Sequence, residues 1–221
     1  MCYPRLSLPI RQLLCVGAAL LFGLSLCEAR IGDSQSNLER RLLGNGGLKY
    51  KDDVIIDARR EKMPYEEFLL YMESDVKLEI YHKSATENKA QRSKFNPKRM
   101  LPGWDLHVIY INGKSAVEVY QRSPVMTEQE MNYLLLLQGE GSGWSKRVKD
   151  GLEKPAPGQL ESADEESVTA FGFGMVRNDG AVRAKKIKNG LLFVDAKWDV
   201  RFAVEKDKEH NAGAPISVNG F

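Results

Sequence analysis

The sequence predicts an α+β fold, in which short helices pack on antiparallel, hairpin-rich sheets. Three observations lead to this class. Asn112-Gly113 is typical of a two-residue hairpin turn between two apolar stretches. Thr127-Glu128-Gln129-Glu130 has the residues of a helix capping box. Apolar residues recur at every second position over residues 192–204, which is the period of a strand.

The composition is that of an ordinary globular protein. Of the 221 residues, 43% are hydrophobic and 28% are charged, which argues against a collagen, a wholly disordered chain and a polytopic membrane protein. The formal net charge is only +2, which gives no electrostatic basis for binding nucleic acid.

Residues 1–29 have the three parts of a secretory signal peptide. Two arginines precede an uncharged apolar run over residues 13–26, and the small residues Cys27 and Ala29 favour cleavage before Arg30. The run is shorter than the ~20 residues of a transmembrane helix. The alternatives are an uncleaved anchor or a lipid on Cys27. We expect a periplasmic or secreted protein that meets the membrane only through its leader, if the leader is retained.

All three cysteines lie within the leader, so the mature chain contains none. Disulfides, thiol nucleophiles and cysteine-ligated metals are thereby excluded from it. The remaining 192 residues are enough for one domain that is held together by burial of apolar surface.

Cap, turn and periodicity signals assign helices and strands to residues 30–149, which we expect to be an α+β domain. The expected helices cover residues 30–44, 64–73 and 127–139, and the expected strands cover residues 48–56, 76–81, 106–111 and 114–120. The basic, polar residues 82–99 are expected to form a solvated loop.

The turn at Asn112-Gly113 also sets a register for the strands on either side of it. Counting outward places His107 opposite Glu118, and a carboxylate beside an imidazole raises the imidazole pKa and orients a base. The same register predicts a core face made of Leu106, Val108, Tyr110, Val117 and Val119.

Residues 150–167 contain two prolines and an acidic cluster, so we expect a mobile linker or long loop there. It separates the α+β domain from an antiparallel β region over residues 168–205. The polar, glycine-rich residues 206–221 are expected to be a disordered tail.

Within this β region, Asp179-Gly180 and Asn189-Gly190 predict two-residue turns. The last strand, over residues 192–204, is long enough to need a bend or bulge. The turns give a register that pairs Arg183 with Ala196 and Lys185 with Val194.

The candidate binding residues are Trp198, Arg183, Lys185 and Trp144. The register places the first three on one face. We favour the interpretation in which residues 150–167 cover this face, because large exposed apolar patches are rare on soluble monomers. The alternative is that this face binds an anionic or aromatic partner.

Few residues suggest catalysis or metal binding. None of the three histidines has a second histidine at the spacing of a helical metal motif, and we expect no metal and no cofactor. Gly139, Gly141 and Gly143 follow a helix and therefore predict a C-cap, not a phosphate-binding loop. His107 with Glu118 is the single catalytic candidate, and no nucleophile can be placed beside this pair.

Several of these signals together resemble a group of uncharacterised exported proteins of Gram-negative bacteria. They are Ile31-Gly32-Asp33-Ser34 with the helix ending at Gly44, Met126-Thr127-Glu128-Gln129-Glu130 with Leu134-Leu135, the glycine-rich turn ending at Trp144, and Arg177-Asn178-Asp179-Gly180-Ala181. The opening helix is more distantly similar to the outer-membrane-assembly lipoprotein (SmpA/OmlA) and β-lactamase-inhibitor modules. The resemblance implies an α+β envelope or secreted domain that works by binding, and it implies no catalytic residue.

We therefore expect an exported, non-enzymatic binding or interaction protein of the cell envelope. Its partner is an unknown envelope protein or a small ligand, and not nucleic acid. One alternative is a metal-independent hydrolase that uses His107 and Glu118. The other is a structural adaptor of the envelope.

Overall fold

The structure is a computed structural model that describes residues 30–71, 75–85, 99–146 and 168–212. Its elements are α2 (Gln35–Gly44), β1 (Leu48–Lys49), α3 (Asp53–Arg60), the 3-10 helix η1 (Glu66–Tyr71), β2 (Val76–Ser84), β3 (Gly103–Ile111), β4 (Lys114–Ser123), α4 (Glu128–Gly139), β5 (Trp144–Lys146), β6 (Met175–Arg177), β7 (Val182–Ile187), β8 (Gly190–Asp195) and α5 (Ala196–Ala212). The predicted α+β class is confirmed. The predicted leader over residues 1–29 and the predicted linker over residues 150–167 lie outside the described residues.

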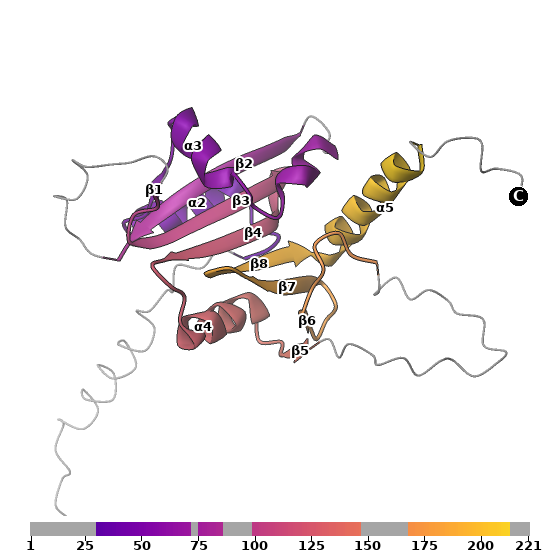
Figure 1. Cartoon of the computed structure of the whole chain (residues 1–221). Helices are drawn as coiled ribbons and strands as arrows, with labels where there is room; N and C mark the ends of the chain where they lie inside the picture. Colours follow the sequence, from indigo (N-terminus) through magenta and orange to yellow (C-terminus); the bar gives the residue numbers. More distant parts are fainter. Residues whose placement is uncertain (1–29, 72–74, 86–98, 147–167, 213–221) are drawn as a thin grey trace, which may run out of the picture.

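The eight described strands form one antiparallel sheet in the order β1-β2-β3-β4-β8-β7-β6-β5 (Figure 1). β4 pairs with β8 at its centre, with Val119 opposite Leu192. The strands on the two sides of residues 150–167 therefore belong to a single sheet.

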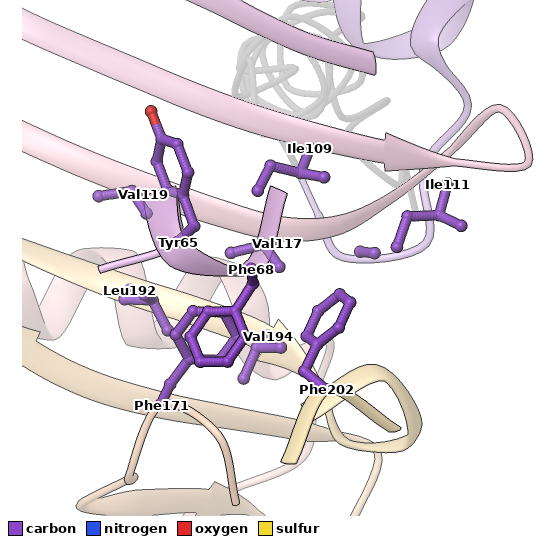
Figure 2. Packing of buried hydrophobic residues seen from close by; sticks show 11 residues of the cluster. Tyr65, Phe68, Ile109, Ile111, Val117, Val119, Phe171, Leu192, Val194 and Phe202 are labelled. Atoms are coloured by element: carbon purple, nitrogen blue, oxygen red, sulfur yellow. The ribbon is translucent and has the colours of Figure 1, made fainter. Parts of the chain in front are cut away.

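The sheet is covered on both faces. On what we call the first face, Phe68 of η1, Phe171 and Phe202 of α5 have ring centroids 4.6–6.0 Å apart and pack over central strand residues (Figure 2). On the second face, Leu38 of α2 and Leu134 of α4 pack against the strands. The central strands β3, β4 and β8 are thus buried on both sides.

The hairpin of β3 and β4 forms around the predicted turn, but its register changes farther along. Tyr110 pairs with Ser115, whereas Ile109 pairs with Val117. Ala116 is therefore an extra residue in β4, a β-bulge. Because successive side chains of a strand point to opposite faces, one extra residue exchanges the faces of every residue beyond it.

The predicted pairing of His107 with Glu118 is consequently wrong. His107 lies opposite Val119, and Glu118 lies opposite Val108 on the other face of the sheet. The predicted single core face is also wrong, because the bulge divides its members. Leu106, Val108 and Tyr110 belong to the second face, whereas Val117 and Val119 belong to the first.

The predicted strand over residues 48–56 is wrong after Lys49. Asp52 caps α3 by accepting hydrogen bonds from the backbone N–H groups of Val54 (2.9 Å) and Ile55 (3.4 Å). The apolar run that suggested a strand lies on this helix, where Val54 is 65% exposed. The helix cap therefore outweighs the β-propensity of three branched residues.

The predicted strand over residues 192–204 is wrong after Asp195, where β8 ends and α5 begins. The Asp195 carboxylate accepts hydrogen bonds from the N–H groups of Lys197 (2.9 Å) and Trp198 (3.4 Å), as a helix N-cap does. Trp198 and Phe202 lie one helical turn apart with ring centroids at 5.9 Å. Residues 206–212, which were included in the predicted tail, belong to this helix.

The other helix signals predict the structure more closely. α4 has the predicted capping box, in which the Thr127 N–H donates to Glu130 Oε2 (2.8 Å) and the Glu130 N–H donates to Thr127 Oγ1 (3.2 Å). α2 begins after Ser34, whose side chain accepts a hydrogen bond from the Asn37 N–H, and not at residue 30. The helix predicted over residues 64–73 is the shorter η1.

The C-terminal hairpins keep their predicted faces but not all of their predicted pairs. The register predicted from the turn at Asp179-Gly180 is confirmed, with Met175 opposite Ala184. The next turn lies one residue earlier than predicted, so that Lys185 pairs with Leu192 and Arg183 pairs with Val194. A register change of two residues exchanges partners without moving a side chain to the other face.

Replacing the α5 cap is expected to destabilise the fold. Asp195→Ala removes the acceptor for two backbone N–H groups and should lower the free energy of unfolding by about 1 kcal/mol. Asp207→Ala, at an exposed position of the same helix, should change it by less than about 0.5 kcal/mol. Urea unfolding measures both values, and equal effects of the two substitutions would contradict the cap.

Candidate ligand-binding cleft

His107, the predicted base, is buried on the first face. Its Nδ1 lies 2.6 Å from the Tyr65 hydroxyl, and the two atoms form a hydrogen bond. Burial lowers the pKa of His107 to about 4. The imidazole is therefore neutral at pH 7 and is fixed in the core by Tyr65.

Glu118 is fully buried on the second face. Its Oε2 accepts hydrogen bonds from the Tyr120 hydroxyl (2.9 Å) and from Gln138 Nε2 (2.7 Å). Gln138 belongs to α4, and its Oε1 accepts the backbone N–H of Ile31 (3.1 Å). Burial raises the pKa of Glu118 to about 7, although these hydrogen bonds act in the opposite direction. The carboxyl thus connects the sheet, α4 and the segment before α2.

Arg183, a predicted binding residue, is buried and paired. Its Nη1 donates to Asp199 Oδ2 and to the Val168 carbonyl at 2.8 and 2.7 Å. Asp199 Oδ1 accepts the backbone N–H groups of residues 170 and 171, so the ion pair links β7, α5 and the segment before β6. Lys185 donates to the carbonyl of Phe171 in this same segment.

The two predicted binding tryptophans are half-buried and contact other parts of the chain. The Arg201 guanidinium lies 5.0 Å from the ring centroid of Trp198. The Trp144 indole N–H donates to the Leu135 carbonyl (2.7 Å). Phe171 and α5 cover part of the face that carries Arg183 and Lys185. A binding role for these four residues remains a prediction.

A second histidine site could not be found from the sequence. His82 Nδ1 lies 2.6 Å from Asp105 Oδ1, which also accepts the Tyr50 hydroxyl at 3.4 Å. Arg59 Nε lies 3.5 Å from Asp105 Oδ2. These four buried residues attach α3 and the segment before it to the first face. His82 Nε2 is buried without a hydrogen-bond partner among the described residues, so the described part of the chain places no nucleophile on it.

His82 and Asp105 meet because they are opposite each other in the β2–β3 pair. No two-residue turn joins these strands, so the sequence sets no register for them. Arg59 could not be assigned to this site from the sequence either, because its helix begins within the predicted strand over residues 48–56.

The second face is hollowed by a cleft of about 230 Å³ between α2 and α4. Its apolar walls come from both helices and from the central strands. They include Leu42, Trp104, Leu106, Tyr120, Leu134 and Leu137. An apolar cavity of roughly 150 Å³ can bind benzene, so a cleft of this size suits an aromatic ring or a short alkyl chain.

Polar groups lie at the edge of the cleft and behind its wall. Glu130 is part of the lining, but its carboxylate accepts hydrogen bonds from Arg122 Nε (2.9 Å) and from the α4 cap. Lys83 is an exposed lining residue. Tyr120 contributes its ring to the wall and directs its hydroxyl to Glu118. The arrangement suits binding of an apolar group.

In the described ranges, no group of three or more histidine, cysteine, aspartate or glutamate residues could hold a metal ion. None of the helices in those ranges is both long enough and apolar enough to span a bilayer. Comparisons with protein-family models, curated proteins and solved structures found no match to the chain.

Glu118 and His107 are expected to give stability opposite dependences on pH. The pKa of Glu118 is about 7 in the folded protein against an ordinary 4.5, so the folded state keeps a proton that the unfolded chain loses. Stability therefore falls as pH rises between these values. The pKa of His107 is about 4 against an ordinary 6.5, so stability falls as pH drops between those values. Each contribution is roughly 3 kcal/mol.

Urea unfolding of two variants at about pH 4.5 and about pH 7.5 separates these contributions. Relative to the unsubstituted protein, Glu118→Gln should be more stable at the higher pH than at the lower, by roughly 2–3 kcal/mol. His107→Gln should show the reverse. If the Glu118→Gln variant had the same pH dependence as the unsubstituted protein, that result would contradict a buried, protonated carboxyl.

Proposed function

We propose that this chain is an exported, non-enzymatic binding protein of the cell envelope, and that the cleft between α2 and α4 takes the apolar part of a small ligand. The observation that carries the proposal is the apolar cleft of about 230 Å³ on the second face. Ligand sites in proteins are typically concave and mainly apolar, with a few polar groups that orient the ligand. Polar residues that line this site include Lys83 and Glu130.

Export is supported by the sequence of residues 1–29, which has the parts of a signal peptide. The resemblance to exported Gram-negative proteins and to small envelope modules supports the same location. A partner protein of the envelope, with the chain as an adaptor, is the competing form of the proposal.

A hydrolase that uses His107 and Glu118 is not proposed. The bulge at Ala116 places these two side chains on opposite faces of the sheet. Each is also engaged elsewhere, His107 with Tyr65 and Glu118 with Tyr120. A base and its orienting carboxylate must be within hydrogen-bond reach of each other.

Titration with a fluorescent apolar probe, N-phenyl-1-naphthylamine, tests the cleft. The probe is expected to bind the purified protein and to be displaced by straight-chain alcohols of about six to ten carbons. Leu134→Trp places an indole in the cleft and should weaken probe binding by at least about tenfold. Leu136→Trp makes the same change at a position of α4 that is 71% exposed, and should leave binding unchanged.

Leu137→Ala is the second test, because it enlarges the cleft and should shift the preference toward longer alcohols. Far-UV circular dichroism and the urea midpoint check that each variant is folded. The proposal is wrong if the folded protein does not bind the probe, or if Leu134→Trp and Leu136→Trp affect binding equally.

A further inference from the structure

The segment that precedes α2 is held on the β3–β4 hairpin by backbone hydrogen bonds. The Gly32 N–H donates to the Ser115 carbonyl, and the Ser115 N–H donates to the Asp33 carbonyl, both at 2.8 Å. The Gln35 N–H donates to the Gly113 carbonyl at 3.3 Å. These bonds fix the path of the chain from Gln35 back to Gly32.

Arg30 itself is also fixed. Its carbonyl accepts the Ser115 hydroxyl at 2.8 Å, and the next residue donates its N–H to Gln138 Oε1. The Arg30 side chain reaches α4, with Nη1 at 3.6 Å from Glu140 Oε1. The backbone nitrogen of Arg30 is therefore held in one position and does not move freely at the end of a loose segment.

That nitrogen lies 3.0 Å from Asp33 Oδ2 and donates a hydrogen bond to it. The Asp33 carboxylate is largely buried, with 20% of the side chain exposed, and it also pairs with Arg41 of α2. A carboxylate in this place can form a charge-assisted hydrogen bond with the Arg30 nitrogen when that nitrogen is positively charged.

We propose that the leader is removed between Ala29 and Arg30, and that the freed α-ammonium group of Arg30 forms an ion pair with Asp33. Hydrolysis by a leader-removing peptidase breaks the C–N bond of this peptide, with water as the co-reactant. The products at neutral pH are a carboxylate on Ala29 and an ammonium group on Arg30. The new charge arises 3.0 Å from the Asp33 carboxylate, where a neutral N–H donor stood.

This inference shares the export part of the proposed function but does not depend on the cleft. Ala29 is the small residue of the predicted cleavage site, and Asp33 follows it at four residues. A cut one residue to either side would move the charge along the chain by about 3.5 Å. Within the described residues it is the Arg30 backbone nitrogen that donates to Asp33 Oδ2, so the ion pair is expected for a mature chain that begins at Arg30.

The first measurement is the intact mass of the protein after export of the full chain in a Gram-negative host. The expected mass is that of residues 30–221. The second measurement is the pKa of the α-amine, followed by nuclear magnetic resonance after reductive methylation with ¹³C-formaldehyde. We expect this pKa above the ordinary value near 8.

Asp33→Asn should return the pKa of the α-amine to its ordinary value. Asp57→Asn, at a side chain that is 62% exposed on α3, is the matched control and should not change it. A chain with two extra glycines before Arg30 should also have an amine of ordinary pKa, and it tests the ion pair without altering Asp33. A different N-terminus, or equal pKa values with and without Asp33, overturns the proposal. Neither result bears on the proposed cleft, which the probe titration tests separately.

Discussion

Burial of the central strands on both faces determines where polar side chains are placed. A buried polar group that lacks a partner is costly, so a polar residue buried on β3 or β4 needs a hydrogen-bond partner. On the first face the Tyr65 hydroxyl forms a hydrogen bond with His107, and on the second face Gln138 of α4 donates a hydrogen bond to Glu118. Because of the bulge at Ala116, His107 lies on the first face of the sheet and Glu118 lies on the second. The covering helices are therefore held on the sheet by hydrogen bonds as well as by apolar contacts.

Signals between neighbours in the sequence predicted much of the fold. The Asn-Gly turn and the capping box of α4 depend on hydrogen bonds within a few residues, so their chemistry is visible in the sequence. The errors arose where an apolar pattern suited both helix and strand, as in residues 54–56 and 198–204. There, Asp52 and Asp195 were the deciding residues, since each caps a helix that the period-two pattern hid.

The site was far less predictable because it is made by contacts between distant segments. Arg183 was placed on the correct strand face, but its partner Asp199 was assigned to a strand and not to α5. His82 and Asp105 meet through a register that no short turn sets. The cleft requires the relative positions of α2 and α4 on the sheet, which no local pattern contains. One inserted residue, Ala116, was sufficient to separate the predicted catalytic pair.

The order of the strands also constrains how the chain reaches its folded form. β8 is the last described strand in the sequence, yet it lies in the middle of the sheet, beside β4 (Figure 1). Until residues 190–195 are present, one edge of β4 is unpaired, and an exposed apolar edge is prone to self-association. Contacts between such distant segments also slow folding. A chain that is made from its N-terminus onward therefore leaves this edge of β4 unpaired until residues 190–195 have followed.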